Sequence, residues 1–473
     1  CAKASVGMPV RIWCCASSTG EEPYSIAMTV VETLGTSPQA EILASDIDTK
    51  VLSKAQAAVY PLDSKGLSGE RLKAHFLRGT FDVTLFEQDT RLGGHTHTVD
   101  VELGGERQVT DTGFIVFNDW TYPNFIALLN ELRVASRPTS MSFSVRCDRT
   151  GLEYNGSSLN GLFAQRRNLL RPSFHRMIRD ILRFNREGPE LVLSRPVDDA
   201  MTVGEFLTQQ RYSREFADQY LLPMGAAIWS CPTGTFAEFP IRFIVEFYRN
   251  HGLLSVRHRP TWRVIEGGSR TYVAAMLPRF RDRVRLNTPV ESVRRTTESV
   301  EVTPREQPVE RFDHVVFACH SDQALRMLAD PTATEQELLG AFPYERNSAV
   351  LHTDESLLPR RRLAWASWNY QIPAEPTAHA TVSYCMNILQ YLRSQHTFCV
   401  TLNSDDRIDP AKILGRFEYH HPIFTTRRAT MQARHREVLN VNRTSFCGAY
   451  WGNGFHEDGV NSALAVCDAL SCR

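Results

Sequence analysis

The chain has 473 residues, enough for two to three domains with large hydrophobic cores. Its 53 basic and 53 acidic residues balance, so the overall charge attracts neither nucleic acid nor an anionic membrane. No run of about 18 apolar residues predicts a membrane span. The eleven cysteines show no C-x-x-C or Cys/His ligand spacing, which indicates free thiols, no metal site and a reducing, cytoplasmic location.

Two further features of the sequence bear on its limits and its surface. The chain begins at Cys1 rather than Met, has no signal peptide, and stops just after a helical pattern, so we expect a fragment of a longer reading frame. Local basic clusters occur at Arg166-Arg167 with Arg171 and at Arg360–Arg362. In a chain of balanced charge, such clusters are typical of a solvated surface.

Strand and helix patterns alternate over residues 9–58. A β-rich run at Val10–Cys14 precedes a Ser/Thr/Gly turn, and a helix begins near Pro23, which is tolerated in a first helical turn. A second strand is predicted at Glu41–Asp46, and a second helix follows from Asp48 or Thr49. This βαβα order predicts a parallel sheet.

Half of a nucleotide-binding signature comes next. Phe81–Glu87 has the pattern of a buried parallel strand ending in an acidic residue, and Arg91-Leu-Gly93-Gly94 follows four residues later. In a dinucleotide-binding βαβ unit, the acid that closes the second strand binds a ribose hydroxyl, and a G-x-G-x-x-G turn lies roughly 20 residues upstream. That turn is absent, and Cys14–Ser25 stands upstream instead. The chain therefore changes character near Thr80.

The remaining elements suggest interleaved segments of two domains. A β-hairpin is predicted from His97–Leu103 and Arg107–Thr112, joined by Gly104-Gly105, and residues 121–220 look mainly helical. Further strands are expected at Val284–Val290, Val300–Thr303, Phe312–Cys319 and within residues 340–403, before a closing helix at Gly459–Leu470.

Two glycine-rich segments complete the flavin pattern. Trp262–Ser269 carries Gly267-Gly268 before a helix, and Phe446–Val460 ends at a helix N-terminus, where backbone N–H groups favour a partly anionic acceptor. From Phe81 to Leu470 the sequence resembles bacterial FAD-dependent oxidoreductases of the flavin amine oxidase superfamily, in a branch described only as predicted NAD/FAD-binding proteins. The resemblance implies an α/β fold: a Rossmann-like, FAD-binding parallel sheet with an interleaved α+β substrate domain.

The resemblance also implies domain bounds and cofactor contacts. The FAD-binding segments would be about 81–118, 262–330 and 440–470, and the substrate and helical segments about 119–261 and 331–439. Glu87 would bind the adenosine ribose, and Val290 would meet adenine through its backbone. The other contacts run from the pyrophosphate to the flavin ring: Arg91, Gly93, Gly94, Thr112, Gly113, Gly448, Gly459 and Val460.

No catalytic acid or base emerges from the sequence. Many amine oxidases have a lysine near the flavin, and no clear counterpart is found. Candidate pocket aromatics, for each of which a place in the core is the stronger interpretation, are Trp229, Trp368, Tyr370 and Trp451. His95 and His97 flank the tight turn and are candidates for flavin or substrate contact, although a structural role is more common there.

Residues 1–80 carry a second resemblance. Arg11–Ala27, Ala44–Asp48 and Ala58–Tyr60 are similar to chemotaxis-receptor glutamate methyltransferases, which implies a βαβα fragment of a fold that binds S-adenosylmethionine (SAM). By position, Glu21 would engage the charged end of SAM and Asp46 its ribose. The match ends near Thr80, before the half-domain that carries the rest of that site. We therefore expect a vestigial SAM site at most, and SAM is not the expected cofactor.

Three hypotheses stay open at this point. The chain is an FAD-dependent oxidoreductase for a small or lipid-like substrate, with FAD binding weakened or lost because a foreign βα unit replaces the first one. Alternatively, it is an active SAM-dependent protein-glutamate methyltransferase fused to a flavoprotein, which is disfavoured because half of that site is missing. The third hypothesis is an inactive chimera. We expect a small-molecule substrate and no nucleic acid partner, and the oligomeric state is left open.

Overall fold

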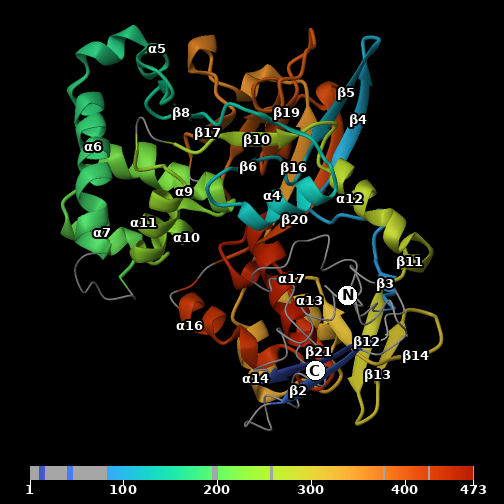
Figure 1. Cartoon of the computed structure of the whole chain (residues 1–473). Coiled ribbons are helices and arrows are strands. Elements are labelled where there is room, and N and C mark those ends of the chain that lie inside the picture. Colours follow the sequence, from blue (N-terminus) through green and yellow to red (C-terminus); the bar gives the residue numbers. More distant parts are fainter. Residues whose placement is uncertain are drawn as a thin grey trace. The chain divides into compact units, whose positions relative to one another are not determined.

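The computed structural model describes residues 10–15, 40–45, 82–193, 201–255, 259–375, 379–423, 425 and 427–471. The chain divides into two compact units, Thr84–Val466 and Cys1–Val83 with Cys467–Arg473. In the latter, β1 (Val10–Cys15) and β2 (Ala40–Ser45) pair in parallel (dark blue in Figure 1), which confirms the parallel pairing predicted there. Glu21, Asp46 and the turn and helices predicted around them lie outside the described residues.

The other strands are short, apart from β16 and β20. They are β3 (Leu85–Phe86), β4 (Thr98–Leu103), β5 (Glu106–Asp111), β6 (Phe117–Asn118), β7 (Ser136–Pro138), β8 (Phe143–Cys147), β9 (Leu152–Asn155), β10 (Trp262–Ile265), β11 (Val284–Arg285), β12 (Val290–Arg295), β13 (Val300–Pro304), β14 (Glu310–Phe312), β15 (Val315–Phe317), β16 (Tyr344–His352), β17 (Trp368–Ile372), β18 (Val382–Cys385), β19 (Cys399–Leu402), β20 (Ile413–Pro422) and β21 (Thr444–Phe446).

The α-helices are α4 (Pro123–Glu131), α5 (Leu159–Leu162), α6 (Pro172–Leu193), α7 (Val203–Gln209), α8 (Arg214–Phe216), α9 (Leu222–Trp229), α10 (Thr233–Ala237), α11 (Ile241–Asn250), α12 (Arg270–Met276), α13 (Ser321–Met327), α14 (Ala333–Leu339), α15 (Met386–Leu389), α16 (Arg428–Ala433) and α17 (His456–Ser471). Among the described residues, none of the helices combines the length and apolar character needed to cross a bilayer.

A seven-stranded mixed sheet forms the largest layer of the Thr84–Val466 unit. Its strand order is β20-β16-β19-β18-β17-β8-β9, and β17 and β8 pair in parallel while the other neighbours are antiparallel. Val382 and Val400 are fully buried in the core beneath it. The strands predicted within residues 340–403 are therefore confirmed.

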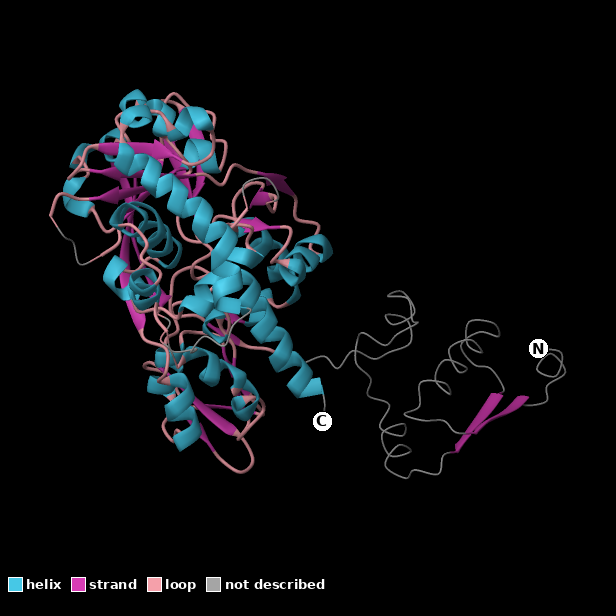
Figure 2. Ribbon diagram, turned by 90° about the vertical axis from the view of Figure 1, so that its left-hand side faces the viewer, coloured by secondary structure: helices cyan, strands magenta, loops and turns pink. Residues whose placement is uncertain are grey.

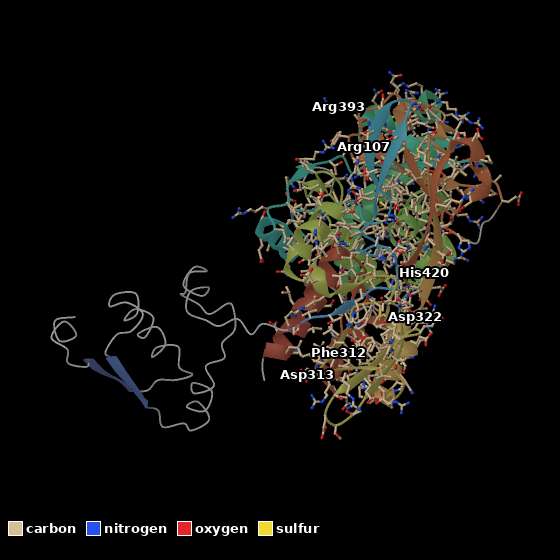
Figure 3. All side chains as sticks on the ribbon, turned by 90° about the vertical axis from the view of Figure 1, so that its right-hand side faces the viewer. Arg107, Phe312, Asp313, Asp322, Arg393 and His420 are labelled. Carbon is tan, nitrogen blue, oxygen red and sulfur yellow. The ribbon has the colours of Figure 1, made fainter. Side chains whose placement is uncertain are left out.

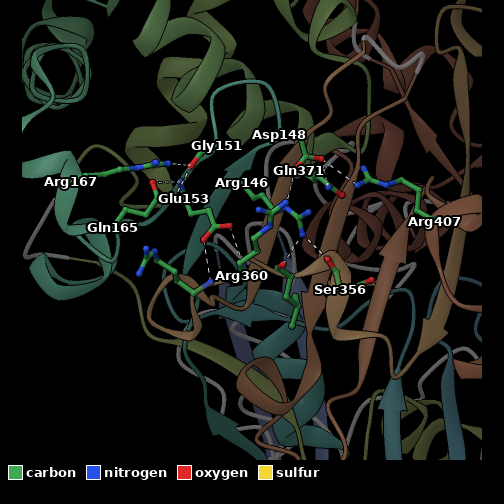
Figure 4. Close-up of polar contacts among 12 residues, drawn as sticks. Arg146, Asp148, Gly151, Glu153, Gln165, Arg167, Ser356, Arg360, Gln371 and Arg407 are labelled. Atoms are coloured by element: carbon green, nitrogen blue, oxygen red, sulfur yellow. Dashed lines mark hydrogen bonds and ion pairs between the residues drawn. The ribbon is translucent and has the colours of Figure 1, made fainter.

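The expectation that residues 121–220 are mainly helical is wrong over 136–155, where β7, β8 and β9 lie. Buried polar residues hide the alternating pattern that reveals such strands. Glu153 in β9 is buried, and its carboxylate accepts hydrogen bonds from the backbone amides of Arg360 and Arg361, at 3.1 and 3.2 Å (Figure 4). The partner amides lie about 207 residues away, so a local reading of the sequence cannot supply them.

Helices α6 to α11 gather on one side of this unit, away from β12–β14 (Figure 1). Pro172 starts α6, and a capping box of Thr202 with Glu205 starts α7, since each satisfies or removes free N–H groups of a first turn. Their shared core is aromatic, with Phe216 and Phe236 fully buried around Trp229.

The parallel sheet expected to bind the nucleotide occurs as two separate pairs. β3 pairs in parallel with β11, and β15 pairs in parallel with β21. Figure 2 shows the strands as several separate groups, and no hydrogen bond joins these two pairs within the described chain. Both pairs nevertheless pack on one core, where Phe317 and Phe446 stack with centroids 5.0 Å apart and Phe86 contacts Phe312.

In each pair, the strand edge turned away from the partner strand has no ladder partner within the described chain. The N–H of Val315 donates to Arg443 and the N–H of Cys447 donates to the carbonyl of Phe317, so the strand alternation points the peptide groups of Val316 away from β21. By the same alternation, Glu87 donates to Arg285, and the peptide groups of Phe86 point away from β11. Val316 is 42 % exposed, although strands of a parallel sheet are ordinarily covered on both faces. The two pairs therefore look like the flanks of a sheet that lacks a middle strand.

Candidate functional site

The turn after β3 is closed by its own side chains. The Arg91 guanidinium donates to the carbonyls of Gly94 and Thr96, at 2.7 and 3.2 Å, and so fixes the loop between them. Gly93 has φ +114°, and a Cβ there would lie 2.5 Å from the Thr96 carbonyl, so only glycine fits. At Gly94, with φ +55°, an added Cβ would meet no atom within 4 Å. A side chain would therefore clash at Gly93, whereas the space beside Gly94 is free.

The segment Thr112-Gly113 lies directly against this turn. The amide of Phe114 donates to the His95 carbonyl at 2.7 Å, and a Cβ on Gly113 would lie 2.2 Å from that same oxygen. The Thr112 hydroxyl lies 2.7 Å from the Tyr419 hydroxyl of β20. Two of the segments predicted to meet the flavin are thus brought together, and Gly113 permits their close approach.

The start of α17 closes the third side. The His456 ring stacks on Phe114, with centroids 3.6 Å apart, and its Nε2 lies 2.8 Å from the Tyr272 hydroxyl and 3.1 Å from the Thr96 hydroxyl. Burial lowers the pKa of His456 to about 3, so the ring is neutral at physiological pH. In the same helix, an added Cβ on Gly459 would meet no atom within 4 Å. The first turn of α17, which leads into Gly459 and Val460, is therefore joined to Thr96 through His456.

A buried carboxylate joins a fourth segment to the site. Asp111 accepts hydrogen bonds from the Thr98 hydroxyl at 2.5 Å, from the Ser269 amide and hydroxyl at 2.9 and 2.7 Å, and from the Gln390 amide at 2.8 Å. Burial raises the pKa of Asp111, and these donors act in the opposite direction. The Gly267-Gly268 loop is thereby fixed beside Thr112.

The residues expected at the adenine end also lie on neighbouring loops. The amide of Thr288 donates to the Glu87 carbonyl at 2.8 Å, and Asn287 donates to Asp89 at 3.0 Å, which places the chain leading into Val290 next to Glu87. The Glu87 carboxylate accepts a hydrogen bond from the Asp89 amide at 2.9 Å and is half-buried. This is a suitable position for binding a ribose hydroxyl at the end of a strand.

Hydrogen bonds also fix the loop at Gly448, near the C-terminal end of the chain. The amide of Gly448 donates to the Ser462 hydroxyl at 2.9 Å, and that hydroxyl donates to the Gly459 carbonyl at 2.8 Å. The Gly448 loop is therefore tied to the first turns of α17, where helix N–H groups favour an electron-rich ligand edge.

Four histidines form a cluster beside the tight turn. His95 stacks on His421 and on His320, with centroids 5.4 and 6.0 Å apart, and His320 lies 6.2 Å from His420, which is labelled in Figure 3. Burial lowers the pKa of His421 to about 4 and that of His95 well below its ordinary value. Among the described residues no group of His, Cys, Asp and Glu has a geometry that holds a metal ion.

The other sequence candidates are dispersed. The four candidate pocket aromatics belong to three different cores, with Trp229 among the helices, Trp368 and Tyr370 under the large sheet, and Trp451 stacked on His435. Lys412 is the only lysine after Lys73 in the sequence, and its ammonium pairs with Asp354 at 3.2 Å. It is therefore engaged at the end of β20 rather than available as a base.

Sequence reasoning did not nominate Asp111, Tyr272, His456 or Tyr419. Asp111 could have been found, because it ends a hairpin strand directly before Thr112-Gly113. The contacts of His456 and Tyr419 join positions 360 and 307 residues apart, and no local pattern in one sequence reports such pairs.

Comparison with known proteins identifies the family to which this fold belongs. A glycine turn after a parallel strand, the adjoining Thr-Gly segment and a helix start that converge on one site define a flavoprotein-type α/β architecture, and the predicted fold class is confirmed. Residues 74–377, more than half of the chain, match the family described as flavin containing amine oxidoreductase, and the chain belongs to that family. Residues 1–92 match the SAM-binding domain of CheR methyltransferases.

Solved structures agree with this assignment. A fatty acid isomerase from P. acnes that produces CLA superposes with a TM-score of 0.58 at 12 % identity, covering 81 % of this chain and 92 % of that one. Cyclohexylamine oxidase from Brevibacterium oxydans superposes with a TM-score of 0.57 at 12 % identity, covering 98 % and 99 %. Identities this low show the fold alone.

The curated relatives match only the N-terminal part. The chemotaxis protein methyltransferase of Escherichia coli K12 is 53 % identical over 72 residues, which are 15 % of this chain and 25 % of that protein. Chemotaxis protein methyltransferase 2 of Pseudomonas aeruginosa is 55 % identical over 74 residues, 15 % of this chain and 26 % of that one. The chain thus spans about a quarter of the methyltransferases that it matches.

Proposed function

We propose that this chain is an FAD-dependent oxidoreductase of the amine oxidase type whose affinity for FAD is reduced. The observation that carries the proposal is the convergence of the Arg91–Thr96 turn, Thr112-Gly113 and the start of α17 on His456. The start of α17 lies 360 residues after Thr96, yet hydrogen bonds and a ring stack with centroids 3.6 Å apart join it to the other two segments. The reduced affinity follows from the missing G-x-G-x-x-G turn, which occurs nowhere in the sequence.

The residues present fit FAD at both of its ends. Glu87 and the loop before Val290 suit the adenosine, while Gly94 and Gly459, whose added Cβ atoms would meet open space, allow a ligand to approach the backbone. When bound, FAD supplies the removal of a hydride or an electron pair from the substrate. The chain's own groups would hold and orient the cofactor. Thr112 is fixed by Tyr419, and the N-terminus of α17 favours a partly negative ring edge.

Two neighbouring folds suggest the substrate classes. These proteins are a fatty acid isomerase and a cyclohexylamine oxidase, so we propose a small or lipid-like substrate. His95 and His421 face the site as neutral imidazoles, because burial lowers both pKa values. A lysine base is not part of the proposal, since Lys412 is paired with Asp354.

The methyltransferase alternative has one supporting observation, the parallel pairing of β1 with β2 inside the segment that matches the SAM-binding domain. The chain nevertheless spans only 25 % of the methyltransferase that it matches over 72 residues. We therefore expect no methyl transfer. If FAD is also absent, the chain is an inactive chimera of the two families.

The test is the visible absorption spectrum of the purified chain, followed by heat release and identification of any nucleotide. Sub-stoichiometric flavin that rises toward one per chain when excess FAD is added supports the proposal. A folded, colourless chain that takes up no FAD contradicts it. Equilibrium dialysis with labelled SAM, run in parallel, tests the alternative.

A further inference from the structure

The outer face of α5, α6 and the intervening 3₁₀ turn at Arg166–Leu170 combines arginines with exposed leucines. Between Leu159 and Arg186 the sequence carries seven arginines and one acidic residue, Asp180, although the whole chain has no net charge. Leu170 is 88 % exposed and Leu159 is 77 % exposed. A single exposed leucine is ordinary, but such a group within one basic segment is not.

The exposed residues of α6 share one helical face. His175, Arg176, Arg179, Leu182, Arg186 and the acidic Glu190 follow the i, i+3, i+4, i+7 spacing of a single stripe, and Leu182 is 55 % exposed. Helix α6 itself lies at the border of the unit (Figure 1). It carries four arginines and three acidic residues, and its outward face presents arginines together with a leucine.

The turn before α6 is held in place against it. The ring of His175 bonds the Leu169 carbonyl at 2.8 Å, and the Arg166 guanidinium bonds the Asn160 side chain at 2.6 Å. The Arg167 guanidinium donates to the Gly151 carbonyl at 2.7 Å (Figure 4). Leu169 and Leu170 are therefore presented by a fixed turn at the basic end of the helix.

An open groove of about 610 Å³ adjoins the stripe and is lined mainly by arginines. Two carboxylates balance part of this charge, since Glu215 pairs with Arg176 at 2.6 Å and Glu187, outside the groove, pairs with Arg183 at 3.2 Å. Asp180 also lines the groove, where it is largely buried and accepts a hydrogen bond from the Ser213 amide. Arg179 and Arg211 form no ion pair within the part of the chain that the structure describes.

We infer that this leucine-arginine surface, formed by Leu159, Leu169, Leu170, Leu182, Arg176, Arg179, Arg211 and Arg214, binds the face of an anionic lipid bilayer. Arginines attract acidic headgroups, and leucines gain free energy by entering the boundary between headgroups and acyl chains. The leucines decide against nucleic acid, because phosphates and base edges offer exposed leucines no comparable gain. The inference goes beyond the proposed flavin chemistry and does not rest on it.

The experiment is flotation of the full chain with vesicles of phosphatidylcholine alone or mixed with phosphatidylglycerol. We expect binding only to the anionic vesicles and weakening in high salt. Arg179→Ala and Arg211→Ala should each lower the partition coefficient about fivefold, the factor that corresponds to about 1 kcal/mol per basic residue. Leu170→Asp should reduce it at least as strongly.

Matched controls lie on other faces. Arg393→Ala changes an exposed arginine whose carbonyl is bonded by Gln108 beside β5, and Val309→Asp changes a side chain that is 54 % exposed between β13 and β14. Arg393 is labelled near the top of Figure 3. Both controls should float as the parent does, with unchanged circular dichroism. Equal binding to neutral vesicles, indifference to Leu170→Asp, or retention of duplex DNA without vesicle binding overturns the inference.

Discussion

The seven-stranded sheet and the parallel strand pairs differ in completeness. In the large sheet every inner strand has two neighbours, and Val400 and Val382 between them are fully buried. In the parallel region, β3–β11 and β15–β21 share a core but exchange no backbone hydrogen bond, and Val316 is 42 % exposed. The large sheet is thus continuous, whereas the two parallel pairs are not joined by any strand of the described chain.

The gap between the two pairs lies where the first strand of a dinucleotide fold would stand, and the missing turn is the one that would bind the pyrophosphate of FAD. In a dinucleotide fold the first strand lies centrally and its turn holds the pyrophosphate. The residues that we propose for adenosine and for the flavin ring keep their contacts with neighbouring loops, as at Glu87 with Thr288 and at Thr112 with Tyr419. We therefore expect a correctly folded scaffold with a weakened cofactor site. The following experiments test the folding of the scaffold and the binding of the cofactor separately.

The largest effect is expected from restoring the missing unit. A β-strand, a G-x-G-x-x-G turn and a helix inserted between Thr80 and Phe81 should raise FAD affinity at least about 100-fold. Two charge-assisted N–H contacts to phosphate are together worth about 3–6 kcal/mol. Fluorescence titration with FAD measures the change, and the same insertion with the three glycines replaced by alanine is the control. Equal affinity in both insertions would mean that the lost turn does not limit binding.

A core substitution tests whether the two parallel pairs are folded despite the gap. Phe446→Ala should lower the free energy of unfolding by about 3–5 kcal/mol, because the ring is fully buried and stacks on Phe317. Val316→Thr should change it by less than about 0.5 kcal/mol, because its side chain is half exposed. Urea unfolding measures both.

The same two substitutions can also be compared in the chain that carries the inserted unit. There Val316 becomes covered by the new strand, and Val316→Thr should then cost more than in the parent. A negligible cost for Phe446→Ala in the parent would show that the parallel pairs are not folded, and the separation of scaffold from cofactor site would fail.

Acid should unfold the histidine side of the site. Burial lowers the folded-state pKa of His421 to about 4, below the ordinary 6.5, so the unfolded chain binds more protons. The stability that this contributes is complete above about pH 6.5 and is lost as pH falls toward 4. At pH 5 the loss amounts to about 2 kcal/mol for one such histidine.

His421→Gln removes that titration. The difference in unfolding free energy between pH 8 and pH 5 should shrink by about 2 kcal/mol in urea melts at the two pH values. Asp458 acts in the opposite direction, because burial raises its pKa to about 6 and the folded chain then binds more protons between about pH 6 and 4. The His421 effect is absent only if its ring is not buried beside His95 and His320.

The sequence could predict the local parts of this structure. The hairpin β4–β5 and helix α17 were expected, although α17 begins at His456, three residues before Gly459. The free edges at Phe86 and Val316 follow from the absent G-x-G-x-x-G unit. By contrast, the predicted strands Phe81–Glu87 and Phe312–Cys319 shorten to Leu85–Phe86 and Val315–Phe317 among the described residues, since a strand that lacks a neighbour keeps fewer ladder bonds.

The site's internal contacts were beyond such prediction. Placement of Thr112-Gly113 came from a resemblance, and the partners that fix it are far away in sequence. Asp111 meets Ser269 158 residues later and Gln390 279 residues later. A buried carboxylate with several donors is recognisable only once the fold brings those donors together.

The smallest expected effect comes from removing a single hydroxyl, and it distinguishes a contribution to FAD binding from a contribution to stability alone. Tyr419→Phe removes the hydroxyl that lies 2.7 Å from Thr112 and 3.1 Å from the His97 ring, and should cost about 1 kcal/mol of stability. Because we propose that Thr112 approaches the flavin, FAD affinity in the restored chain should also fall, which titration measures. Tyr344→Phe is the matched control, since its hydroxyl accepts from the Ser321 amide at 3.0 Å next to the histidine cluster rather than at Thr112. It should have a similar stability cost and leave FAD affinity unchanged. Equal loss of affinity in both variants would place the flavin contact elsewhere than at Thr112.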